Sequence, residues 1–176
     1  MREAARRAGV SPAAPFRHFE SREALMTAVA IEAQRRFRAE IDAALQESPH
    51  RDPLARLRAF GVAYLRWAMR NPAHFEIISS GRLFDYDKSA DLVRDNAEII
   101  AMMAQTLKEA SAQGRLRPAD LSHVQIAARA MVYGFARMNI DGHFPRWGVA
   151  ASEAESTTEA IVDLFIDGIA KGPGPG

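Results

Sequence analysis

The sequence contains no cysteine, no long hydrophobic run and almost no net charge. The absence of Cys from its 176 residues excludes disulfides, thiolate metal ligands and cysteine nucleophiles together. No run of about 18 apolar residues is present, so the sequence predicts no membrane-spanning helix. The charged start, Arg-Glu-Ala-Ala-Arg-Arg, is unlike a signal peptide. We therefore expect a cytoplasmic protein with no membrane partner.

The alternation of apolar and polar residues that is typical of strands is also missing, and no internal repeat is visible. Apolar residues recur instead at the three- and four-residue spacing of helices. A composition of 48% hydrophobic and 26% charged residues is typical of a folded globular protein. We predict an all-α protein of roughly eight helices, with a small head and a helical-bundle body.

The net charge of +1 conceals a basic start and an acidic end. Residues 1–22 hold five arginines and two glutamates, whereas residues 150–176 hold one lysine and five carboxylates. A basic start on a near-neutral chain suits a local contact with a polyanion such as DNA. The same charges also fit the simpler interpretation of solvated helix faces.

The stretch from Ala8 to Leu25 has the pattern of a helix-turn-helix. A basic, Ala-rich helix over residues 2–8 is predicted to end at Gly9, a residue that adopts the left-handed cap conformation easily. Ser11 and Pro12 then suit the start of a second helix only about three residues later. A turn this tight makes two short helices cross steeply.

The residues of this stretch also resemble a known signature. Gly-Val-Ser, Pro-Ala-Ala-Pro-Phe-Arg-His-Phe and Ser-Arg-Glu-Ala-Leu, in residues 9–25, resemble the DNA-binding segment of the tetracycline-repressor (TetR) family of transcriptional regulators. The resemblance implies a DNA-binding surface of Ser11, Pro12, Ala13, Ala14, Phe16, Arg17, His18 and Arg22. Family members have another helix before this segment. We expect that helix to be missing here, which leaves residues 1–30 as a partial DNA-binding domain.

Residues 31–171 are predicted to form the regulatory and dimerisation domain, and residues 172–176 a disordered tail. Caps and apolar spacing predict helices over 21–47, 53–70 and 73–79, one capped by Ser89 or Asp91 that lasts to Gln113, one from Leu121 to about Ile140, and a last helix from Ser152. Asn71 before Pro72 is expected to cap the third of these. Residues 121–140 are apolar on most sides, so we expect that helix to be central. The run from Tyr64 to Phe75 resembles TetR proteins with a WHG-type C-terminal domain.

Aromatic and methionine side chains of the body suit either an ordinary core or the wall of a ligand cavity. The TetR resemblance favours a cavity, because the bodies of these regulators usually contain an inducer pocket. From the residues themselves we hypothesise a small apolar or aromatic effector, with Tyr64, Tyr133, Asn139 or His143 as polar anchors. The expected ligand-binding residues are Phe60, Tyr64, Trp67, Phe75, Met102, Met103, Met131, Tyr133, Phe135 and Met138.

The last two long helices are candidates for a dimer interface, because they are more apolar than one packing partner requires. Internal core is the alternative. The expected interface residues are Ile126, Ala130, Ile161, Leu164, Phe165 and Ile169.

Enzymatic interpretations have little support in the sequence. Glu47 and His50 have a di-iron spacing, but Pro49 breaks the helix that would align them. We predict no catalytic residue, no metal and no cofactor.

Together, these patterns predict a ligand-responsive transcriptional regulator, usually a repressor in this family. A homodimer would bind a palindromic operator through the Ser11–His18 helix, and an effector in the body would shift the helix over 21–47. The alternative is a helical protein for small-molecule binding or dimerisation that has lost DNA binding through N-terminal truncation.

Overall fold

The computed structural model of the protein describes residues 6, 9, 11, 17–49, 51–80 and 83–172. These residues form α-helices joined by loops and short 3-10 turns, and they contain no strand beyond an isolated bridge between Leu116 and Ala170. The all-α prediction is confirmed. The elements in chain order are α3 (Arg22–Glu47), α4 (Pro53–Arg70), α5 (Pro72–Ser80), η1 (Tyr86–Lys88), α6 (Ala90–Ala112), α7 (Leu121–Ile140), η2 (Phe144–Trp147), η3 (Ala151–Glu153) and α8 (Ala154–Ile169).

Several helices begin where the sequence predicts. The side chains of Ser21, Asp52 and Ser89 accept hydrogen bonds from backbone N–H groups in the first turns of α3, α4 and α6. At the N-terminal end, Gly9 has φ +67°, the left-handed conformation expected for a residue that ends a helix. The rest of the predicted helix over residues 2–8 lies outside the described residues, apart from Arg6.

One predicted helix start is wrong, and at another the predicted capping residue makes a different side-chain bond. The Asn71 side chain donates to the Trp67 carbonyl at 3.0 Å, so it binds the end of α4 rather than capping α5. The last helix begins at Ala154 instead of following Ser152, because a 3-10 turn occupies residues 151–153. In that turn the Glu153 carboxylate accepts from the Ala150 N–H at 2.9 Å. Both bonds are local, so each of these polar side chains had more than one possible backbone partner within four residues.

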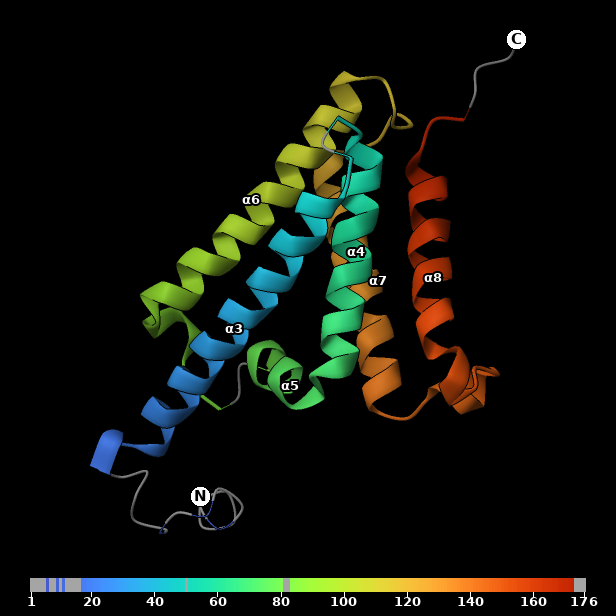
Figure 1. The fold of residues 1–176 in the computed structure, drawn as a ribbon. Coiled ribbons are helices and arrows are strands. Elements are labelled where there is room, and N and C mark those ends of the chain that lie inside the picture. Colours follow the sequence, from blue (N-terminus) through green and yellow to red (C-terminus); the bar gives the residue numbers. More distant parts are fainter. Residues whose placement is uncertain are drawn as a thin grey trace.

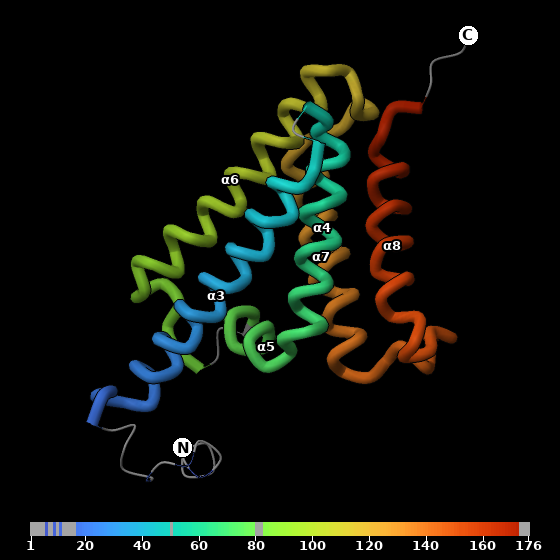
Figure 2. Tube along the Cα trace, viewed as in Figure 1, coloured from blue at the N-terminus to red at the C-terminus, as the bar shows by residue number. Residues whose placement is uncertain are grey.

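Helix α4 lies in the middle of the body, with α3 and α6 on one side, α8 on the other and α7 against it (Figures 1 and 2). Eleven residues of α4 are buried, compared with four of α7. The expectation that the helix over 121–140 is central is therefore wrong. Its buried residues, Val124, Ala128, Val132 and Ala136, form a single row at four-residue spacing, so the described residues cover only one face of this helix.

Helix α8 packs closely against α4 at a glycine. A Cβ added to Gly61 would lie 3.1 Å from Cγ1 of Val162, which is closer than most side chains tolerate. Val162 is itself 1% exposed. The absence of a side chain at Gly61 thus allows the two helices to approach.

The end of α8 is also joined to the loop between α6 and α7. The Arg117 N–H donates to the Ile169 carbonyl at 2.9 Å, and the Lys171 N–H donates to the Arg115 carbonyl at 2.8 Å. These bonds flank the bridge between Leu116 and Ala170. They fix the last described residues of the chain to the far end of the bundle from the start of α3 (Figure 1).

Candidate functional site

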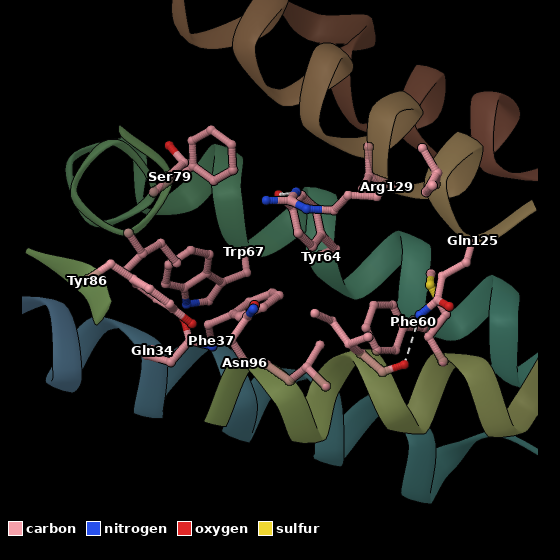
Figure 3. Close-up of a pocket in the computed structure, with 17 residues that line it drawn as sticks. Gln34, Phe37, Phe60, Tyr64, Trp67, Ser79, Tyr86, Asn96, Gln125 and Arg129 are labelled. Atoms are coloured by element: carbon pink, nitrogen blue, oxygen red, sulfur yellow. Dashed lines mark hydrogen bonds between the residues drawn. The ribbon is translucent and has the colours of Figure 1, made fainter. Parts of the chain in front are cut away.

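A cavity of about 410 Å³ lies inside the body, bounded by side chains from α3, α4, α5, α6 and α7 and by Tyr86 of η1 (Figure 3). This volume is within the usual range for small-molecule sites, which is about 300–1,000 Å³. Ile100 of α6 and Ile126 of α7 line the cavity and are also exposed, at 51% and 66%. The cavity therefore opens to solvent between α6 and α7.

Aromatic rings form much of the wall. Phe60, Tyr64 and Trp67 recur at the spacing that places side chains on one face of α4, and all three are buried. The Phe37 ring of α3 lies 5.2 Å from the Tyr64 ring, edge to face, and 5.0 Å from the Trp67 ring. Contacts of this geometry add stability beyond the area that they bury. The wall is thus apolar and held in shape by its own packing.

Amide side chains supply polar groups at several points of this wall. The amide of Gln125 donates to the Ile100 carbonyl at 2.8 Å, which connects α7 to α6 at the opening. Gln34 lies toward the other end of the cavity in Figure 3. It is only 7% exposed, yet no described residue hydrogen-bonds its side chain. The amide atoms of Gln34 are not among the fully buried unpaired polar atoms of the described residues, so they remain accessible from the cavity to a bound molecule or to water.

Arg129 is the only charged residue among the described side chains that line the cavity. Its Nη1 donates to the Tyr64 hydroxyl, and its guanidinium carbon lies 5.2 Å from the ring centroids of both Tyr64 and Tyr133. Figure 3 shows Arg129 next to Tyr64 at the cavity wall. Burial raises the pKa of the Tyr64 phenol, although the Arg129 charge opposes that effect. The phenol is therefore neutral near pH 7 and keeps a proton that it can donate.

The predicted ligand-binding residues fall into two groups. Five line this cavity: Phe60, Tyr64, Trp67, Phe75 and Met103. The others, Met102, Met131, Tyr133, Phe135 and Met138, do not line it. Of these, Met131 lines a second cavity of about 30 Å³ between α4, α6, α7 and α8. Of the predicted polar anchors only Tyr64 lines the larger cavity, because Asn139 and His143 follow the part of α7 that bounds it.

Six polar residues of the wall were not predicted from the sequence: Gln34, Ser79, Tyr86, Asn96, Gln125 and Arg129. Polar residues in helices usually face solvent, so nothing local distinguishes Gln34 or Asn96. Arg129 did carry a signal. It is the only Arg, Lys, Asp or Glu between Leu121 and Ala136, in the most apolar stretch of the chain.

The predicted dimer residues also separate by exposure. Ile126, Ala130 and Leu164 are exposed, with Leu164 at 70%. Ile161, Phe165 and Ile169 are half-buried, and Phe165 and Ile169 pack against the cluster that contains Leu57 and Leu107. Three of the six predicted interface residues are therefore exposed in the single chain.

The predicted DNA-binding residues are described only in part. Ser11, Arg17, His18 and Arg22 are exposed, and Arg22 is the first residue of α3. Pro12, Ala13, Ala14 and Phe16 lie outside the described residues.

Within the described part of the chain, no three His, Asp or Glu side chains are grouped so that they could hold a metal ion. No helix in that part is long and apolar enough to cross a membrane.

Comparison with known proteins found one family model that matches the body and several solved structures that match nearly the whole chain. Residues 57–165 match the family model described as "Tetracyclin repressor-like, C-terminal domain". A Rhodococcus sp. RHA1 protein of unknown function is 27% identical, with a TM-score of 0.74, and the match covers 97% of this chain and 84% of that one. No curated protein sequence matches the chain.

Two further solved structures share the fold. A tetR-family regulatory protein from Rhodococcus RHA1 is 19% identical, with a TM-score of 0.77, covering 98% of this chain and 86% of that one. The TetR-family transcriptional regulator PfmR from Thermus thermophilus is 22% identical, with a TM-score of 0.75, covering 94% of this chain and 86% of that one.

Proposed function

The chain belongs to the tetracycline-repressor-like (TetR) family, and from this premise we propose that it is a ligand-responsive transcriptional regulator. It acts as a repressor that binds a palindromic operator as a homodimer and releases it when a small apolar or aromatic effector occupies the cavity.

The observation that carries this proposal is the double role of α3. Gln34 and Phe37 of α3 line the cavity, while the same helix begins at Arg22, beside the residues predicted to contact DNA. Twelve residues separate Arg22 from Gln34, which is roughly 18 Å along an α-helix. A ligand that changes the position of Phe37 therefore acts on the element that leads to the DNA-binding segment.

The coupling follows from two states of the same dimer. An effector that contacts Phe37 and Trp67 better in one position of α3 shifts the population toward that position. In a dimer, the tilt of two α3 helices sets the separation of the two heads, which must be about 34 Å to match successive major grooves. A coupling free energy of about 1–3 kcal/mol is typical and changes operator affinity by about 5- to 150-fold.

The dimer in this proposal is formed by α7 and α8. Ile126, Ala130 and Leu164 are exposed apolar residues on these helices. An isologous interface would cover the same residues on both copies.

The test is selection of an operator from random duplex DNA by the purified chain, followed by fluorescence anisotropy at several salt concentrations. Enrichment of a palindrome, with an affinity that falls steeply as salt rises, supports the proposal. A dimer that binds small molecules but enriches no sequence would contradict the DNA-binding part and leave the helical ligand-binding protein as its function.

A further inference from the structure

We propose that the ligand of the cavity is a small organic acid, an apolar molecule whose carboxylate binds Arg129. The inference rests on the proposed function, since it takes the cavity to be the effector site. It adds the chemical class of the effector, which neither the fold nor the family membership specifies.

The first argument is the missing counterion. The arginines of the neighbouring helix α4 pair with carboxylates: Arg56 with Glu109, Arg58 with Asp163, and Arg66 with Glu159. Arg129, in contrast, makes no ion pair with any described residue, and the described wall of the cavity contains no Asp or Glu.

Because of the position of Arg129, the absence of a carboxylate partner affects the free energy of ligand binding. Arg129 is exposed near the opening, so water can solvate its guanidinium while the cavity is empty. A ligand that fills the cavity would displace part of that water, and covering a charge is costly unless an opposite charge accompanies it. A ligand carboxylate would supply that charge.

The second argument is the way in which Arg129 is held. The rings of Tyr64 and Tyr133 and the Tyr64 hydroxyl fix the guanidinium in place. One of its five N–H groups is used by Tyr64, and the others have no acceptor among the described residues. A fixed guanidinium with free N–H groups matches a carboxylate, which accepts two parallel hydrogen bonds. The neutral Tyr64 hydroxyl can donate a further bond to the same group.

The third argument concerns the body of the ligand. Beyond Arg129 the wall is formed mainly by aromatic and aliphatic side chains, including Phe37, Trp67 and Phe75. These would bind an apolar body and exclude a sugar or an amino acid, whose polar groups would be buried without partners. At the far end, the unpartnered amide of Gln34 can bind one hydroxyl or carbonyl oxygen. The cavity thus suits an apolar body with an anion at one side.

The chain offers a direct readout of binding at this site. It contains two tryptophans: Trp67 lines the cavity at 3% exposure, and Trp147 is 74% exposed. In the Trp147→Phe variant all tryptophan emission comes from Trp67, so a change on titration reports occupation of the cavity. Two pairs of transparent probes differ only in charge: decanoic acid and decanamide, and 4-cyclohexylbutanoic acid and its amide.

At pH 7.5 both acids are ionised, and we expect each to bind at least tenfold more tightly than its amide in Trp147→Phe. Adding Arg129→Gln should remove this preference, because the acids lose far more affinity than the amides, and Arg129→Lys should restore part of it. Arg146→Gln is the matched control, because Arg146 is exposed and makes no ion pair with any described residue. Circular dichroism would verify that each variant is folded.

Two results would overturn the inference while leaving the cavity as an effector site: amides that bind as tightly as acids, or an acid preference that survives Arg129→Gln. If neither member of either pair changes the Trp67 emission, the inference and the proposed role of the cavity both fail. If the purified chain binds the acids as expected but selects no operator, only the proposed function is contradicted.

Discussion

Helices α4 and α7 are both rich in apolar residues, but they occupy opposite positions in the fold. Helix α4 is buried on almost every side, although it carries four arginines. Helix α7 carries two arginines, and the described residues cover only one of its faces. The number of neighbours, rather than apolar content, therefore decides which helix is central.

The arginines of α4 explain how a charged helix can be central. Arg56 reaches Glu109 of α6, and Arg58 reaches Asp163 of α8 at 2.5 Å. The aliphatic stems of arginine pack on apolar surface while the charged ends remain near solvent. Helix α7 has one such connection to another helix, from Arg137 to Glu76 of α5, among the ion pairs of the described residues. Its uncovered apolar residues are left for another partner, which we propose to be a second copy.

The largest expected effect on stability comes from shortening a fully buried side chain of α4. Leu65→Ala should lower the free energy of unfolding by about 3 kcal/mol, because Leu65 is fully buried and its removal leaves a cavity. The measurement is urea denaturation followed by circular dichroism. Ile126→Ala on α7 is the matched control, and at low protein concentration it should cost less than about 0.5 kcal/mol. Equal costs would contradict the contrast between the two helices.

The next effect concerns association. Ile126→Glu with Leu164→Glu should weaken the proposed dimer at least 100-fold, or about 2.7 kcal/mol, because each buries a carboxylate in an apolar interface. Light scattering across a concentration series would measure the shift to monomer. Glu98→Gln on α6, an exposed position, is the control. A wild-type chain that is monomeric at micromolar concentration would contradict the dimer.

Two helical glycines provide a smaller and sharper test. Gly61→Val should cost about 1–3 kcal/mol, because the new side chain would overlap Val162 and push α8 away from α4. Gly134→Ala on α7 should instead stabilise the protein by about 0.5–1 kcal/mol, since nothing lies within 4 Å of the added Cβ. Both changes can be measured by thermal unfolding. A second substitution, Val162→Ala, should recover part of the Gly61→Val loss.

The smallest expected effect is the pH dependence of the pair between α4 and α8. The Arg58 guanidinium lowers the pKa of the Asp163 carboxyl, so the pair stabilises the fold above the ordinary carboxyl range. That contribution is lost as pH falls below about 4 and through the lowered pKa. Both groups are more than a third exposed, so Arg58→Met should cost at most about 1 kcal/mol at pH 7.

Urea titrations of wild type and Arg58→Met at pH 7 and pH 3 would measure this difference. We expect it to shrink at the lower pH. Arg146→Met serves as the control with no ion pair to any described residue. A difference that is constant or larger at pH 3 would show that packing, rather than charge, explains the loss.

The sequence was sufficient for the features that depend on local chemistry. Ser21, Asp52 and Ser89 cap the predicted helices because a cap needs only a side-chain oxygen and the first turn that follows it. The predicted helix from Leu121 to about Ile140 agrees with α7, which the Asp120 cap and the turn at Gly142 bound. The TetR family was identified from the same kind of local pattern.

The features that depend on distant neighbours could not be predicted. The apolar residues of α7 did not reveal that one face has no partner within the described chain. In the candidate site, the α4 aromatics were predicted through the TetR resemblance, whereas Gln34 and Arg129 were not predicted. Gln34 of α3 and Arg129 of α7 line the same cavity only because the fold brings the two helices together. The sequence of either helix alone does not show this.

The joining of α8 to the loop between α6 and α7 also affects how the protein can be handled. The hydrogen bonds from Arg117 to Ile169 and from Lys171 to Arg115 attach the end of α8 to the loop between α6 and α7. A fusion partner or surface linker attached directly after Ile169 would pull on α6 and α7, whose residues form the opening of the cavity. If the protein is immobilised through this point, the measured binding signal would combine the effect of the ligand with the effect of the force on the attachment. Attachment through an exposed side chain elsewhere, such as Lys108 of α6, leaves these hydrogen bonds intact.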